Sequence, residues 1–181
     1  MHVSLVEQAK RGDREAFNAL ARERVDGLFA TAFRILRDWD AAADATQDAL
    51  IDAWRHLPGL RQTEKFDGWM YRLVVSRCTR ELRRRRRFGS LQLIGAEPSE
   101  EADGILALPR RDELKRAFQA LSAEHRAVLV LRYYLGWTPA EIAETLGISA
   151  GTVSSRLHYG LRATRAALAA NERQTEARIS G

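Results

Sequence analysis

Apolar residues recur every three or four positions through most of this chain, a spacing that places them on one face of an α-helix. Breaks in the pattern coincide with helix-capping residues, at Ser4, Asp13, Asp40 and Ser122, and with the helix-stopping pair at 58–59. Glycine and proline are sparse, which favours an all-α protein. After a short first helix, the pattern predicts helices over residues 13–36, 40–57, 66–87, 110–121, 122–134 and 138–168.

Residues 138–168 carry the pattern of two helices joined by a tight turn. A capping box opens the first helix, a small residue lies at its centre, and a glycine follows where the backbone needs a positive φ. A serine can cap the second helix, whose apolar row recurs every four residues. Together these features favour a DNA-reading helix-turn-helix, with an ordinary helical hairpin as the alternative. The residues concerned are Thr138, Pro139, Glu141, Ala143, Gly147, Ser149, Val153, Leu157 and Leu161.

The helix predicted over 66–87 has an apolar face and, about 200° around its axis, a cationic one. Trp69 and Tyr71 flank the start of the cationic face, and an unbroken arginine block at 83–87 ends it. Arginines beside aromatic rings suit single-stranded nucleic acid, because bases stack on the rings. Core packing of Trp69 is an equally good interpretation, whereas five adjacent cations imply a compensating anion. The apolar row is Met70, Val74, Cys78 and Leu82, and the opposed row is Arg72, Ser76, Arg80 and Arg84.

The preceding helix carries aspartates four residues apart, at positions 40, 44, 48 and 52, with Gln47 beside them. Like charges at this spacing destabilise a helix by about 0.2–0.5 kcal/mol per pair. The first of these carboxylates gain from the helix N-terminus, but Asp48 and Asp52 lie too far along the helix for that. Two interpretations stay open: the acids pair with arginines of the same domain, or they form a docking face for a basic protein surface.

Composition divides the chain into two helical parts. Residues 88–109 contain no basic residue, four acidic ones and several helix breakers, which predicts a linker. We therefore expect domains at 1–88 and 110–170, a linker at 89–109 and a polar, frayed tail at 171–181. The formal net charge of +5 indicates a polyanionic partner such as nucleic acid.

Catalytic, metal and membrane functions lack candidate residues. The single cysteine, Cys78, lies in an apolar row and the histidines are scattered, so neither a disulfide scaffold nor a metal site is expected. With no glycine-rich phosphate loop and no nucleophile–base pair, we expect no enzyme and no cofactor. No apolar run matches a membrane span and the N-terminus has no signal-peptide pattern, so we expect a cytoplasmic, soluble protein without membrane insertion.

Taken in order, these motifs resemble a bacterial RNA polymerase sigma factor of the extracytoplasmic-function type over nearly the whole chain. Residues 43–49 are similar to the region-two segment that binds the clamp helices of the largest polymerase subunit. Residues 66–72 and 81–84 are similar to the segment that melts and reads the −10 promoter element. Residues 121–132 and 138–168, with Ser-Ser-Arg at 154–156, are similar to region four, which reads the −35 element.

The resemblance implies a role for each matching residue. Ser76 and Arg80 stand where the family usually has asparagine and an acid, and Ser122 replaces a usual proline. Binding of core polymerase falls to Asp44, Gln47 and Asp48. Binding of the −10 element falls to Trp69, Tyr71, Arg72, Ser76, Arg80, Arg83 and Arg84. Binding of the −35 element falls to Thr152, Ser154, Ser155, Arg156, His158, Tyr159 and Arg162.

The resemblance also implies the partners: core RNA polymerase through its clamp helices and flap, promoter DNA, and an anti-sigma protein. The function it implies is recruitment of core polymerase to specific promoters and initiation of transcription. The alternative is a helix-turn-helix regulator with an N-terminal sensing or dimerisation domain. That alternative explains residues 138–168 but not the cationic helix with its acidic neighbour.

Overall fold

The computed structural model describes the backbone of residues 2–87 and 110–179, and the chain divides between Ala96 and Glu97 into two compact units. Every regular element within these ranges is helical, which confirms the predicted all-α class. The linker expected at 89–109 lies outside the described residues, and the domain bounds given above stay a prediction.

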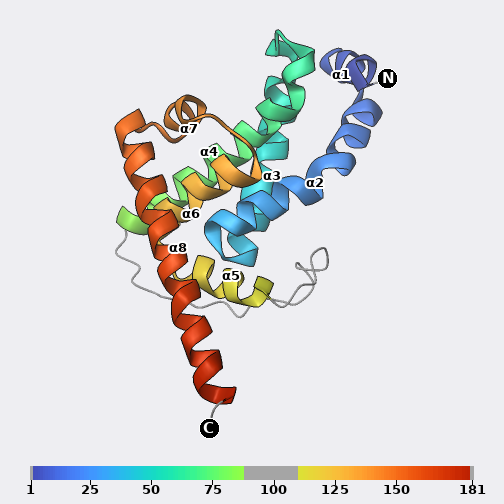
Figure 1. Ribbon diagram of the computed structural model, residues 1–181. Coiled ribbons are helices and arrows are strands. Elements are labelled where there is room, and N and C mark those ends of the chain that lie inside the picture. Colours follow the sequence, from blue (N-terminus) through green and yellow to red (C-terminus); the bar gives the residue numbers. More distant parts are fainter. Residues whose placement is uncertain (1, 88–109, 180–181) are drawn as a thin grey trace. The chain divides into compact units, whose positions relative to one another are not determined.

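The first unit is built on α2, α3 and α4, which pack against one another, while α1 packs against α2 (Figure 1). Most of the buried residues of α3 are alanines, so neighbouring helices can approach it closely. Met70, Val74 and Cys78 are buried on α4 as predicted, whereas Leu82 is half-buried. The elements are α1 (His2–Lys10), α2 (Arg14–Leu36), α3 (Trp39–His56), 3-10 turns at Leu57–Gly59 and Thr63–Lys65, and α4 (Phe66–Arg87).

Two of the three predicted capping residues in this unit need correction. Asp13 caps α2 as expected, accepting hydrogen bonds from the backbone N–H groups of the second and third residues after it. For α3 the cap is Asp38, whose side chain accepts from the N–H of Ala41 at 2.9 Å, so the start predicted at Asp40 is wrong. Ser4 lies inside α1 rather than at its cap.

The second unit is arranged around α8, which packs against α5, α6 and α7. Ser122 caps α6 as predicted, but the helix expected over 122–134 changes to a π-helical turn after Leu129. The backbone of α8 stays helical beyond residue 170, where we expected it to fray. The elements are α5 (Arg110–Gln119), α6 (Ala123–Leu129), the π-helical turn Val130–Tyr134, α7 (Pro139–Leu146) and α8 (Ala150–Ile179).

The local geometry of the helix-turn-helix confirms its sequence signals. Both hydrogen bonds of the capping box are present: Thr138 N–H donates to Glu141 Oε2 at 2.9 Å, and Glu141 N–H donates to Thr138 Oγ1 at 3.3 Å. Gly147 ends α7 at a φ of 63°, which an L side chain rarely adopts. Ser149 Oγ then accepts from the N–H of Thr152 at 3.1 Å and caps α8.

The inward face of α8 differs in one respect from the predicted apolar row. Val153 is fully buried, but Leu157 and Leu161 are only half-buried, and Gly160 is buried beside them. A Cβ atom at Gly160 would lie 3.1 Å from Leu129 Cδ1, tighter than ordinary van der Waals contact. The missing side chain therefore allows α8 to cross α6 closely.

We expect Gly160→Ala to lower the free energy of unfolding of the second unit by about 1–2 kcal/mol. Overpacking against Leu129 costs about 1–3 kcal/mol, and the higher helix propensity of alanine offsets only about 0.5–1 kcal/mol of that. Gly151→Ala is the matched control on the same helix, because its Cβ would meet only Ser149 Oγ, at 3.8 Å. Urea denaturation with amide-exchange readout on α6 and α8 should give opposite signs for the two variants, and equal signs would contradict this account of the crossing.

Candidate functional site

The exposed face of α3 carries the polar residues singled out in the sequence. Asp44, Gln47 and Asp48 are all exposed, while the opposite face is buried. Within the described part of the chain, Asp44 forms no ion pair or hydrogen bond through its side chain. Its carboxylate is therefore available to a partner, and Asp44 remains the main candidate residue for docking.

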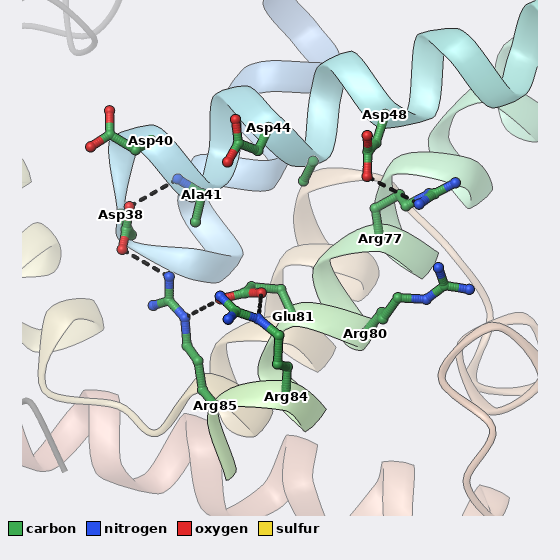
Figure 2. Close-up of a pocket in the computed structure, with 11 residues that line it drawn as sticks. Asp38, Asp40, Ala41, Asp44, Asp48, Arg77, Arg80, Glu81, Arg84 and Arg85 are labelled. Atoms are coloured by element: carbon green, nitrogen blue, oxygen red, sulfur yellow. Dashed lines mark hydrogen bonds and ion pairs between the residues drawn. The ribbon is translucent and has the colours of Figure 1, made fainter. Parts of the chain in front are cut away.

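A cleft of about 370 Å³ lies between α3 and α4, with carboxylates on the α3 side and guanidinium groups on the α4 side (Figure 2). Arg77 closes one end: its Nη1 lies 3.0 Å from Asp48 Oδ2, and its Nε donates to Asp52 Oδ2 at 2.7 Å. This hydrogen bonding holds the pKa of Asp52 below its usual value. Asp48 and Asp52 thus agree with the interpretation in which the acids pair with arginines of the same domain, and Asp44 does not.

Arg85 closes the other end of the cleft (Figure 2). Its Nη2 donates to Asp38 Oδ2 at 2.8 Å and its Nε donates to Glu81 Oε1 at 2.7 Å. Arg84 contacts the same glutamate, at 2.7 and 2.9 Å, and its hydrogen bonds lower the pKa of Glu81. Asp38 and Glu81 therefore supply part of the negative charge that the arginine block requires.

The outward row of α4 is exposed as its spacing predicts. Arg80 also lines the cleft and has no ion pair among the described residues. The row thus presents cations along the helix beyond those that bind α3. The members of the row, Arg72, Ser76, Arg80 and Arg84, are all exposed, and so is the neighbouring Arg83.

The two aromatic candidates of α4 are half-buried rather than fully exposed. The ring of Trp69 lies 6.0 Å from that of Phe66, centroid to centroid, and Phe66 is a core residue. The hydroxyl of Tyr71 lies directly over Gly27 of α2. Each ring thus has one part in the core and one part toward solvent. For Trp69 this arrangement is intermediate between core packing and an exposed position for base contact.

The first half of α8 presents a mixed polar and aromatic face. Tyr159 is 51% exposed, lies 5.5 Å from the ring of His158, and has the guanidinium of Arg162 5.5 Å from its centroid. The half-buried residues are Thr152 and Arg156, and Arg156 forms no ion pair with Glu141 or Glu144. The exposed candidates are Ser154, Ser155, His158, Tyr159 and Arg162.

Three residues of the first unit, Arg24, Gly27 and Arg77, make contacts that no sequence pattern singled out. Arg77 reaches two aspartates more than twenty residues earlier in the chain, and no local spacing signals such a pair. Arg24 and Gly27 lie on α2 and contact residues at the start of α4. A glycine inside a long helical pattern was the one available signal, because glycine costs about 0.5–1 kcal/mol there and needs a packing reason.

Within the described ranges, no grouping of histidine, cysteine and acidic side chains has the geometry of a metal site. Burial raises the pKa of the Cys78 thiol to about 12. None of the described helices is long and apolar enough to cross a membrane.

Two family models match the chain. Sigma-70 region 2 matches residues 20–88, which include α3 and α4, and Sigma-70 region 4 matches residues 117–166, which include the helix-turn-helix. Both matches contain the candidate residues described above. The order of the two regions agrees with the order of motifs in the sequence.

Curated relatives and solved structures agree with these models. The chain is 36% identical to the ECF RNA polymerase sigma factor SigL of Mycobacterium tuberculosis, over 90% of this chain and 94% of the relative. It is 27% identical to the ECF RNA polymerase sigma factor SigW of Bacillus subtilis, over 88% and 92%. Its fold is similar to that of CnrH in complex with the cytosolic domain of CnrY, with a TM-score of 0.60, 25% identity and coverage of 93% and 97%. Its fold is also similar to that of the sigma factor RpoE of Bartonella quintana, solved with the anti-sigma factor NepR. The TM-score is 0.64 at 22% identity, and the match covers 84% of this chain and 96% of the other. The motifs, the fold and these likenesses together establish that the chain belongs to the extracytoplasmic-function family of RNA polymerase sigma factors.

Proposed function

We propose that three exposed helix faces divide the work of transcription initiation in this sigma factor: α3 binds core polymerase, α4 opens the −10 element, and the start of α8 reads the −35 element. The observation that carries the proposal is the cleft between α3 and α4, where an acidic and a cationic face meet but neither is fully neutralised by the other. Each face keeps unpaired charge for a partner of opposite sign.

For polymerase docking, the pairing within the chain separates the candidate acids. Asp48 is engaged by Arg77, so it contributes to docking only by exchanging or sharing that partner. Asp44 and Gln47 are exposed without that restraint. We assign the main contact with the clamp helices to these two residues, because the unpaired carboxylate of Asp44 is attracted to a basic surface and the neutral amide of Gln47 can add a hydrogen bond.

For promoter opening, half-buried rings beside exposed arginines support the role of α4. A ring that is anchored on one side and open on the other can stack on a base without ordering a flexible side chain first. Three exposed arginines of the same helix, Arg72, Arg80 and Arg83, suit the phosphates of the separated strand. Arg84 pairs with Glu81, whereas Arg80 has no ion pair among the described residues, so we assign Arg84 a smaller share than Arg80.

For recognition of the −35 element, the start of α8 combines base-reading and phosphate-binding side chains. Residues near the N-terminus of a recognition helix usually meet base edges, and later ones meet the backbone. Ser155 and Arg156 occupy the early turns, and Arg162, over the ring of Tyr159, lies further along. We therefore assign base contacts to the first pair and phosphate contact to Arg162.

We further propose that the chain has no catalytic activity of its own and works in the bacterial cytoplasm, where core polymerase and promoter DNA are found. The second unit would also contact the flap of the polymerase. An anti-sigma protein is proposed as a regulator, supported by the likeness in fold to the sigma factor RpoE of Bartonella quintana, whose structure contains the anti-sigma factor NepR. The alternative of a ligand-sensing regulator is not retained, because region 2 of the sigma family accounts for the N-terminal unit.

Asp44→Lys should weaken binding of core polymerase by about tenfold or more, since a cation placed against a basic surface costs at least about 1.4 kcal/mol. Asp26→Lys is the matched control, because Asp26 is exposed on α2, outside the proposed docking face. Binding of fluorescently labelled protein to core polymerase measures the affinity, and circular dichroism checks the helicity. Equal affinity of the two variants would rule out docking through Asp44.

Trp69→Ala should slow formation of the open complex by about fivefold to a hundredfold, the effect of losing one base–aromatic stack worth about 1–3 kcal/mol. Binding to the closed promoter should stay unchanged. Trp69→Phe keeps an aromatic face and should recover most of the rate. If Trp69→Ala instead unfolds the first unit, the core interpretation of this residue is the correct one.

Arg156→Ala should remove about 1–3 kcal/mol of promoter discrimination if its guanidinium binds a guanine, and the loss should fall on one base position. An even loss across all sequences would instead assign Arg156 to a phosphate. Run-off transcription on a library randomised across the −35 element measures this, with Arg165→Ala, an exposed residue later on α8, as the control. Unaltered promoter preference together with a lower melting temperature would give Arg156 a structural role only.

A further inference from the structure

One face of α2 contacts the start of α4 through two residues to which no role has been given above. Arg24 and Gly27 lie three positions apart on α2, so they share a face of that helix. Arg24 binds Asp67, and Gly27 meets Tyr71, both in the first turns of α4. These turns carry the two aromatic side chains assigned to promoter opening.

Arg24 is a nearly buried cation held by several partners. Its side chain is 9% exposed, its Nε donates to Asp67 Oδ1 at 2.5 Å, and its Nη1 donates to the carbonyl of Leu20 at 2.9 Å. Nη1 also donates to Glu23 Oε2 at 3.0 Å. A guanidinium with its N–H groups engaged in different directions has one orientation, so Arg24 fixes the first turn of α4 relative to α2.

The contact continues from Arg24 to Trp69 through one ring. The guanidinium carbon of Arg24 lies 5.5 Å from the centroid of Phe66, which is 1% exposed. The ring of Phe66 in turn lies 6.0 Å from that of Trp69, at an interplanar angle of 44°. Trp69 is therefore supported on its buried side by a ring that Arg24 holds in place.

Gly27 affects the position of the second aromatic residue, Tyr71, because it has no side chain. A Cβ atom at this position would lie 2.6 Å from the hydroxyl oxygen of Tyr71, which is closer than real Cβ contacts. Its φ is not in the left-handed region, so backbone conformation does not require glycine here. A side chain at this position would displace the end of the Tyr71 ring from its place against α2.

We propose that Arg24 and Gly27 are positioning residues that set Trp69 and Tyr71 in the orientation in which they capture bases of the opened promoter. This proposal rests on the proposed role of those aromatic side chains in opening. A ring that is already oriented stacks on a base without losing further side-chain freedom, so its orientation affects the opening step directly. Neither α2 residue needs to touch DNA.

The first test moves Tyr71 without removing it. Gly27→Ala should reduce formation of the open complex, measured by permanganate reactivity of unpaired thymines, by about fivefold to a hundredfold, the range for one lost stack. Affinity for core polymerase should stay unchanged. Tyr71→Phe removes the oxygen that the new Cβ would meet and leaves the ring carbon Cζ at 3.8 Å, an ordinary contact. The double variant should therefore open the promoter as well as Tyr71→Phe alone, and additive losses would overturn the role of Gly27.

The second test separates positioning from stability at Arg24. Arg24→Gln removes the guanidinium from Asp67, whose carboxylate side chain is 58% exposed and so stays hydrated, and should lower opening over the same range. On a template with the −10 element already unpaired, the defect of Arg24→Gln in open-complex formation should be smaller, because capture of the bases no longer has to drive melting. Arg22→Gln, at an exposed position of the same helix, is the matched control and should behave as the wild type on both templates. An equal loss on both templates would make Arg24 a structural residue only and would overturn the proposal for it.

Trp69→Ala distinguishes failure of this inference from failure of the proposed function. If Trp69→Ala opens promoters at the wild-type rate, the role of α4 in opening is wrong. If Trp69→Ala is defective while Arg24→Gln and Gly27→Ala match the wild type, opening by α4 stands and positioning by α2 is overturned. Defects in all of these variants on duplex promoter, with unchanged affinity for core polymerase, support both.

Discussion

The charges of α3 and α4 have to be paired where the two helices cross, and this requirement shapes the first unit. Either helix alone would carry like charges at spacings that destabilise it. Arg77 offsets the aspartates at one end of the cleft, and Arg85 offsets Asp38 and Glu81 at the other. Asp44 and Arg80 also line this cleft, without an ion pair among the described residues (Figure 2). The ion pairs between α3 and α4 are therefore sufficient to hold the crossing. They are also incomplete, so that charged side chains remain for partners.

Magnitudes indicate which term holds the helices together and which one aligns them. Partly exposed ion pairs contribute about 0–1 kcal/mol each, whereas full burial of a single large apolar side chain contributes about 1.5–3 kcal/mol. Phe66, Met70 and Val74 are all buried at this core, so apolar packing supplies most of the stability. The ion pairs select the register of the crossing. The proposed face for the polymerase and the proposed face for DNA then lie on α3 and α4, two neighbouring helices of one compact unit.

Local signals predicted the parts of the fold that depend on neighbouring residues. The capping box at Thr138, the positive φ of Gly147 and the cap at Ser149 all follow from chemistry within a few residues, and all are present. The outward row of α4 followed from helical spacing alone. The cap of α3 was misplaced by two residues, because Asp38 and Asp40 are equally good caps and only the fold selects between them. The pairing of Arg77 with Asp48 and the approach of Tyr71 to Gly27 depend on how distant helices cross, which no periodicity within one helix specifies.

Cys78 illustrates how burial decides the reactivity of a side chain as well as its packing. A thiol is attacked by oxidants and alkylating reagents through its thiolate, and a pKa of about 12 leaves almost none of that form at neutral pH. Because the sequence contains no other cysteine, oxidants that act on thiols have no reactive target in this protein. A cysteine introduced on the exposed face of α3 or α8 can consequently be coupled to a fluorophore at one defined position, with the native residue left in place.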